Sequence, residues 1–204
     1  MILRRRRIAQ GAAAVFAAMG VCALGYVALV VVDARVYEAE ARARLAAPAP
    51  AASAPRARRE GDLLGEIHSA RIGLSAVIVE GESPAVLRHA VGHLADTPAP
   101  GESGNVALAA HRDTLFRPLR HIRAGDVISV TAGGRERHYE VEWTAVVPPD
   151  AVEVLEPTDG DTLTLITCHP FWFVGAAPNR FIVRARQVHS DRRIPSRVTG
   201  EEVL

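Results

Sequence analysis

A predominantly apolar run of 25 residues, Ile8–Val32, limits what the N-terminal part of this chain can fold into. Gln10 carries its only strongly polar side chain. At a rise of about 1.5 Å per residue, a helix of this length reaches roughly 37 Å, which is enough to cross a bilayer core of about 30 Å with some tilt. A cleaved signal peptide is the alternative interpretation, but its apolar core usually has only about 7–15 residues. The run therefore predicts a retained transmembrane helix over residues 8–32.

The charge distribution predicts the orientation of this helix. Residues 1–7 contain four consecutive arginines, Arg4–Arg7, and the positive-inside rule keeps such an end in the cytoplasm. We therefore expect a single-pass protein of the plasma (inner) membrane whose remaining chain lies outside the cytoplasm. Residues 1–60 have a net charge of +6 and residues 61–204 a net charge of −5. The negative balance argues against nucleic-acid binding, because neutralising phosphates requires a basic surface.

Composition divides the rest of the chain into three parts. Residues 33–61 begin with a short charged helical extension and continue into an Ala- and Pro-rich stretch, which predicts a linker. We expect residues 62–188 to form the folded domain. Residues 189–204 are polar and charged, and they predict a C-terminal tail.

Short alternating segments between turn residues fill the folded domain. Seven or eight such strands with few helices predict a mainly β fold, a closed or nearly closed barrel. Within one strand, alternation predicts that Tyr139, Val141 and Trp143 share a face. The expected strands are 64–67, 72–79, 106–110, 127–131, 137–147, 162–167 and 181–186, with a brief helix at 85–90 and a hairpin turn at Gly133-Gly134.

One cysteine of the folded domain has no partner with which to form a disulfide. Cys168 follows an alternating strand and precedes Pro170, whereas Cys22, the other cysteine, lies in the apolar run and out of its reach. An unpaired thiol in an exported domain indicates a reactive group. A buried, inert cysteine is the alternative interpretation.

A cysteine nucleophile usually needs a histidine and a cation nearby. His111 directly follows the apolar strand and can project into a cleft, although it also fits a surface histidine that begins a turn. His169 adjoins the cysteine, but neighbouring side chains of an extended chain point in opposite directions. Arg180 begins the last strand, where its fork of donors could contact a developing oxyanion, unless it is an ordinary solvated arginine.

Neither a metal site nor a cofactor site is expected. His111, His121 and His138 are too scattered for a ligand motif, and the adjacent Cys168 and His169 cannot easily share one tetrahedral ion. The chain contains no Gly-rich phosphate loop.

Several motifs resemble those of the sortase family. Thr164-Leu165-Ile166-Thr167-Cys168 is similar to the T-L-x-T-C nucleophile motif of these proteins. The segments 104–114 and 175–183 resemble the family's histidine and arginine segments, and Leu119–Asp126 resembles its L-x-x-I-x-x-G-D stretch. The resemblance runs from about residue 64 to residue 186 and is nearest to class D.

This resemblance implies an eight-stranded sortase-type barrel in which Cys168 is the nucleophile, His111 the acid/base and Arg180 the contact to substrate and oxyanion. It further implies a cysteine transpeptidase, both peptidase and acyltransferase. Such an enzyme cleaves a Leu-Pro-x-Thr-Gly-like sorting signal of exported proteins between Thr and Gly. It then transfers the acyl group from a thioester to an amine, either on a cell-wall precursor or on a pilin lysine.

Two other functions are compatible with parts of the pattern. An L,D-transpeptidase also uses an exported cysteine, but that cysteine typically follows Ser-His-Gly, where this chain has Thr-Leu-Ile-Thr. A non-catalytic, membrane-tethered binding module could retain an idle thiol. Calcium activates some sortases, yet no carboxylate cluster in this sequence requires it.

Overall fold

The computed structural model describes residues 2–46, 58–172 and 175–188. The chain divides into two compact units, residues 1–46 and 47–204. Residues 47–57 of the expected linker and the whole expected tail at 189–204 lie outside the described residues.

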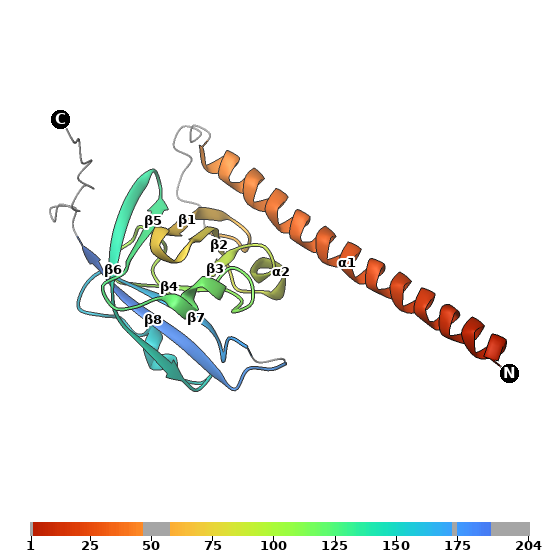
Figure 1. Ribbon diagram of the computed structural model, residues 1–204. Helices are drawn as coiled ribbons and strands as arrows, with labels where there is room; N and C mark the ends of the chain where they lie inside the picture. The colour runs from red at the N-terminus through yellow and green to blue at the C-terminus, as the bar shows by residue number, and fades with distance from the viewer. Residues whose placement is uncertain (1, 47–57, 173–174, 189–204) are drawn as a thin grey trace, which may run out of the picture. The chain divides into compact units, whose positions relative to one another are not determined.

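The first unit is one continuous helix, α1, from Ile2 to Ala46 (Figure 1). Within it, Val15–Leu45 is long and apolar enough to cross a membrane, judged by length and composition. A helix suits such a segment because it satisfies every backbone polar group internally, as a hydrocarbon environment requires. The expected N-terminal apolar helix and its charged helical extension are both confirmed. Glu38 and Arg42 form an i,i+4 ion pair of 3.3 Å in that extension.

The second unit is a closed barrel of eight strands in the order β1-β2-β3-β4-β7-β8-β6-β5 (Figure 1). The predicted mainly β barrel is therefore confirmed. The strands are β1 Leu63–Ser69, β2 Leu74–Glu80, β3 Val91–His93, β4 Asn105–Ala109, β5 Val127–Ala132, β6 Arg135–Val147, β7 Thr162–His169 and β8 Asn179–Val188. Connections contain α2 Pro84–Leu87 and three 3-10 turns, η1 Ala70–Ile72, η2 Arg117–His121 and η3 Val152–Leu155.

Strand β3 was not among the predicted strands. It has three residues, Val91–His93, which are too few to show an alternating pattern. It is a strand because it pairs in parallel with β2 and antiparallel with β4. Its conformation therefore depends on hydrogen bonds to two neighbouring strands.

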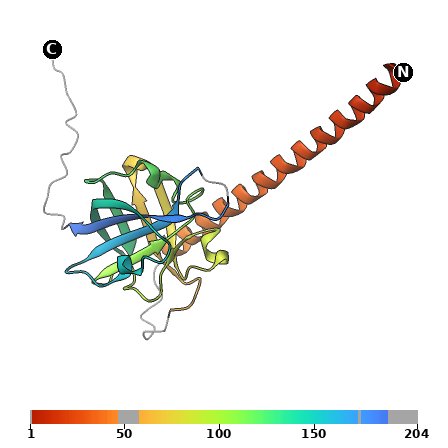
Figure 2. The same cartoon turned by 90° about the horizontal axis from the view of Figure 1, so that it is seen from below.

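Alternation along β7 separates the core from the outer face of the barrel. Leu163 and Leu165 are fully buried in the central hydrophobic cluster, together with Val183 and Ala185 of the adjacent strand β8. Since successive side chains point to opposite faces, Thr164, Ile166 and Cys168 lie on the outer face. In Figure 2, β7 and β8 appear in two blue shades, side by side across the barrel wall.

A bulge in β6 overturns one sequence-based expectation. Tyr139 and Val141 are buried in the core, but the register shifts between Val141 and Trp143, which leaves Glu142 as an extra residue. An inserted residue reverses the face of every side chain that follows it. Trp143 is therefore on the outer face and 42% exposed, and the prediction that it shares a face with Tyr139 and Val141 was wrong.

The L-x-x-I-x-x-G-D stretch fixes the entry to β5. Leu119 and Ile122 are buried, and Asp126 accepts hydrogen bonds from the Arg71 guanidinium and, at 2.6 Å, from the Arg123 backbone amide. Burial by itself would raise the pKa of Asp126, but these hydrogen bonds outweigh it and hold the pKa of the carboxyl below its usual value.

Candidate active site

Cys168 lies near the end of β7, on the outer face of the barrel. Its thiol is half-buried and is not part of a disulfide. The strand ends at His169, and Pro170 follows, a residue that has no backbone N–H to continue a ladder. The strand thus holds the sulfur rigidly at a position that solvent can still reach.

Arg180 lies directly opposite the cysteine. The two residues are Cα partners in the antiparallel pair β7–β8, so their side chains emerge on the same face. The Arg180 Nη1 donates to the carbonyl oxygens of Asn179, at 3.2 Å, and Ala177, at 3.5 Å. Among the described residues, its Nε and Nη2 have no hydrogen-bond partner, which leaves donors for a ligand.

His111 reaches the site from β4, which runs parallel to β7. In this register Ala109 pairs with Ile166, and the Ala110 amide donates to the Ile166 carbonyl at 3.3 Å. Continuing the pairing by two residues brings His111 level with Cys168. The sequence separates these two residues widely, but the parallel pairing brings them to the same edge of the sheet.

Two further hydrogen bonds fix the backbone around the histidine. The buried Thr167 hydroxyl donates to the Ala110 carbonyl at 2.8 Å, which ties the residue before Cys168 to the residue before His111. The amide of the core residue Phe116 donates to the His111 carbonyl at 3.1 Å. The backbone that carries His111 is therefore fixed by the core on one side and by β7 on the other.

The three predicted site residues line one pocket of about 400 Å³. In the described part of the chain, neither the Cys168 sulfur nor either His111 ring nitrogen has a hydrogen-bond partner, so both groups are available to a substrate. The lining residues are His111, Arg112, Asp113, Cys168, Gly175, Ala176, Ala177 and Arg180.

His169 has a different environment, in keeping with the expectation that it is not the partner of the cysteine. Its ring centroid lies 6.1 Å from that of Phe171, 6.2 Å from that of Trp172 and 6.3 Å from that of Phe181. This aromatic cluster packs beside the strand end, and none of its members lines the pocket.

Sequence reasoning missed the contribution of Arg112. Its guanidinium is almost completely buried, and its Nη2 donates to the Gly175 carbonyl at 2.9 Å. This bond joins the turn after β4 to the loop that leads into Arg180. The sequence shows only that Arg112 follows His111. A solvent-exposed arginine at that position would give the same sequence pattern.

No group of three or more His, Cys, Asp or Glu side chains is arranged to hold a metal ion in the described ranges. The expectation that the protein needs no metal and no cofactor stays a prediction.

Comparison with known protein families identifies the family to which this barrel and its pocket belong. The family model of the sortase domain matches residues 67–188. The chain belongs to the sortase family. In agreement with the predicted likeness to class D, Sortase D of Bacillus subtilis (strain 168) is 33% identical over 129 residues, which are 63% of this chain and 65% of that protein. The matched region is thus slightly less than two thirds of this curated sortase.

Solved sortase structures share the barrel. A Clostridium perfringens Sortase D5 transpeptidase superposes with a TM-score of 0.59 at 31% identity, covering 65% of this chain and 83% of that one. A lid mutant of Sortase A from Corynebacterium diphtheriae gives a TM-score of 0.61 at 28% identity, covering 81% and 95%. The neighbouring strands β4, β7 and β8, which carry the pocket residues, therefore belong to a barrel that known sortases share.

Proposed function

We propose that this chain is a membrane-anchored cysteine transpeptidase, in which Cys168 is the nucleophile, His111 the general acid and base, and Arg180 the contact to the oxyanion. The observation that supports this most is that the three side chains, on three different strands or their ends, line one pocket in a sortase barrel. Membership of the sortase family does not favour an L,D-transpeptidase, and a binding module would have no use for this arrangement.

The first half-reaction forms a thioester. The Cys168 thiolate attacks the carbonyl carbon of the Thr residue in a Leu-Pro-x-Thr-Gly-like sorting signal, and a C–S bond forms as the carbonyl oxygen becomes negative. Arg180 donates hydrogen bonds to that oxygen. The C–N bond then breaks, and the departing Gly amine takes a proton from the His111 imidazolium.

The second half-reaction transfers the acyl group. An amine attacks the thioester carbon and gives its proton to the now neutral His111, and the Cys168 thiolate leaves as the new amide forms. An amine held against the thioester competes well with water because its effective concentration is high. Two successive half-reactions on one nucleophile predict ping-pong kinetics.

The partners are exported proteins that carry a sorting peptide and an amine on a cell-wall precursor or a pilin lysine. Ile166, half-buried on the same face as Cys168, offers an apolar contact for the peptide. Membrane insertion through α1, with residues 1–7 in the cytoplasm, would confine enzyme, donor and acceptor to one surface. Protease shaving of intact spheroplasts tests the orientation. Survival of the barrel domain would contradict it.

Mass spectrometry of the acyl-enzyme tests the activity itself. Purified protein is mixed with a library of fluorogenic sorting peptides, quenched in acid and digested, and we expect a thioester on the peptide that contains Cys168. Hydroxylamine should release the acyl group and accelerate turnover. Acylation at another residue, or none with any peptide, would refute the proposal. Repeating the assay with a chelator tests the expected independence of metal ions.

A further inference from the structure

One charged residue that lines the active-site pocket has no role in the chemistry proposed above. The two half-reactions use a thiol, an imidazole and one guanidinium, and the second guanidinium, that of Arg112, holds the Gly175 carbonyl. Residues 175–177 of the opposite loop have small side chains or none. The group left over is the carboxylate of Asp113, the only acid among the described residues that line the pocket.

The backbone that carries Asp113 is fixed on the histidine side of the pocket. Asp113 lies in the turn between β4 and η2, two residues after His111. The amide of the buried residue Phe116 donates to the His111 carbonyl at 3.1 Å, and the Arg117 amide donates to the Thr114 carbonyl at 3.1 Å. These two bonds close the turn around Asp113. The carboxylate therefore starts from a fixed position beside the imidazole.

The protein itself does not engage this carboxylate. Asp113 is exposed at the pocket, and within the described ranges its side chain forms no hydrogen bond and no ion pair. The two guanidinium groups that line the same pocket, those of Arg112 and Arg180, donate to backbone carbonyls in the segment 175–179. The Asp113 carboxylate is thus available to a ligand that enters the pocket.

The first half-reaction does not account for a carboxylate at this place. It uses the Cys168 thiolate and develops an oxyanion at Arg180, and both of these groups are negative. Like charges in one pocket repel each other, so Asp113 stabilises neither of them. The ligand that an unpaired carboxylate favours is a cation.

The second half-reaction supplies such a cation. Primary amines are mainly protonated at neutral pH, since an unperturbed lysine side chain has a pKa of about 10.4 and an α-amino group one of about 7.7–8.0. An acceptor therefore arrives as an ammonium and loses one proton to solvent before the neutral amine attacks the thioester. Its second proton passes to His111 as the amide forms. Because His111 takes that proton, the acceptor occupies the side of the pocket on which Asp113 lies.

We propose that Asp113 determines specificity for the acceptor, and that its carboxylate binds the ammonium form of a primary amine beside His111. This inference rests on the function proposed above and deepens it. An ammonium group is the chemistry that the two acceptor sources, a cell-wall precursor and a pilin lysine, have in common. Asp113 takes no part in making or breaking the thioester, so its role is in binding the acceptor and not in the chemical steps.

Removing the charge should therefore act on one kinetic parameter. In Asp113→Asn the KM for an ammonium acceptor rises about fivefold, which corresponds to the upper range for an exposed ion pair. The value of kcat and the KM for the donor peptide stay near those of the wild type. So does the KM for hydroxylamine, a nucleophile that is uncharged at neutral pH. Asp113→Glu keeps the charge, and its KM values should lie near those of the wild type.

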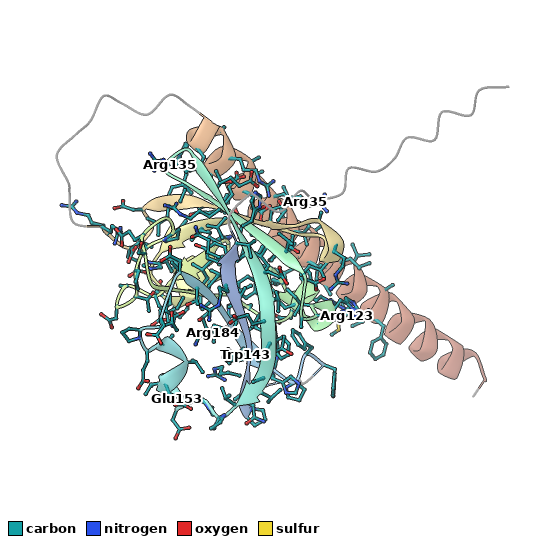
Figure 3. All side chains as sticks on the ribbon, turned by 90° about the vertical axis from the view of Figure 1, so that its left-hand side faces the viewer. Arg35, Arg123, Arg135, Trp143, Glu153 and Arg184 are labelled. Atoms are coloured by element: carbon teal, nitrogen blue, oxygen red, sulfur yellow. The ribbon has the colours of Figure 1, made fainter. Side chains whose placement is uncertain are left out.

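Two ammonium acceptors and one control variant of the full chain make the test specific. Triglycine presents an α-ammonium, and Nα-acetyl-lysine amide presents a side-chain ammonium. Glu153→Gln is the matched control, because Glu153 of η3 is an exposed carboxylate that does not line the pocket, and Figure 3 labels it at the outer edge of the barrel. Added salt should raise the wild-type KM for both ammonium acceptors but not the KM for hydroxylamine, since salt screens an exposed ion pair.

Acceptor kinetics are measured at a fixed concentration of a fluorogenic donor peptide. Support is a rise of at least twofold in the KM for either ammonium acceptor in Asp113→Asn, with hydroxylamine and Glu153→Gln unchanged. A rise for triglycine alone assigns an α-amine source, and a rise for the lysine derivative alone assigns a side-chain source. A rise below twofold for both, or an equal rise for hydroxylamine, would overturn the inference. If Asp113→Asn does not fold, the salt dependence of the wild type decides between the same outcomes.

A thiol-modification experiment separates this inference from the proposed function, because it requires no acylation. The rates at which a cationic and a neutral methanethiosulfonate modify Cys168 are compared by mass spectrometry. Asp113→Asn should lower the ratio of the cationic to the neutral rate at least twofold, since the carboxylate attracts cations to the pocket. An unchanged ratio would overturn the inference, because any change in KM would then have another cause. A wild type that forms no thioester with any sorting peptide refutes the function and the acceptor role together, whereas normal acylation with an unchanged ratio refutes the role of Asp113 alone.

Discussion

Cys168 and Arg180 are cross-strand partners on β7 and β8, facing each other in one antiparallel register. Their juxtaposition is a property of the ladder and does not depend on the conformation of the connecting loop. Residues opposite each other in an antiparallel pair have their Cβ atoms about 4.5–5.5 Å apart. The side chains that carry the thiol and the guanidinium therefore start from neighbouring positions that the strand pairing fixes.

Replacing Cys168 by Ala should abolish acylation by a sorting peptide and leave the barrel folded, because the sulfur forms no hydrogen bond in the described structure and the change is small. The measurement is the thioester mass combined with circular dichroism. The matched control is Cys22→Ala, which removes the other thiol, in α1, and should leave acylation intact. Turnover by Cys168→Ala above background would count against the nucleophile assignment.

Replacing Arg180 by Lys should lower kcat by about 10²–10³, the usual cost of losing one oxyanion donor. An ammonium keeps the charge but cannot present a planar fork of donors. Steady-state kinetics with a fluorogenic peptide measure the effect, and Arg186→Lys on the same strand serves as a control that should stay near the wild type. A near-normal kcat for Arg180→Lys would place Arg180 outside the reaction.

Thr167→Val tests whether the backbone next to His111 depends on β7. The change preserves shape but removes the hydroxyl that donates to the buried Ala110 carbonyl, so we expect a loss of about 1–3 kcal/mol in unfolding free energy. Because the bond connects the segments that carry Cys168 and His111, kcat should fall as well. Denaturant unfolding and kinetics are measured in parallel. A destabilised variant with unchanged kcat would show that the bond is only structural.

Asp126 should make stability depend on pH in the acidic range. Its pKa is lowered in the folded protein, so its contribution is fully present above the unfolded value of about 3.9 and is lost as pH falls through the lower folded value. Thermal unfolding between pH 6 and pH 2 tests this. Asp126→Asn should reduce the midpoint at pH 6 and flatten its decline with acid. An equally steep decline in the variant would assign the effect to other carboxyls, such as Glu102, whose pKa is also lowered, chiefly by the Ala99 amide.

The N-terminal apolar helix and most strands were predictable because their signals are local. A long apolar run and an alternating strand such as Thr162–Thr167 report their environment residue by residue. Strand β3 and the bulge at Glu142 were missed for the opposite reason. Both arise from pairing with neighbouring strands, and no sequence pattern within Val91–His93 or Arg135–Val147 indicates that pairing.

For the site, the reactive groups could be listed from the amino-acid sequence: one thiol in the folded domain, a histidine at a strand end and an arginine at the start of the last strand. That these groups line one pocket, and that Arg112 joins two of its walls through the Gly175 carbonyl, became visible in the folded barrel. Strand order and register depend on cooperative pairing and burial across the whole barrel, so they cannot be read from one segment. Contacts between residues far apart in the chain follow from that register, and no local sequence pattern reports them.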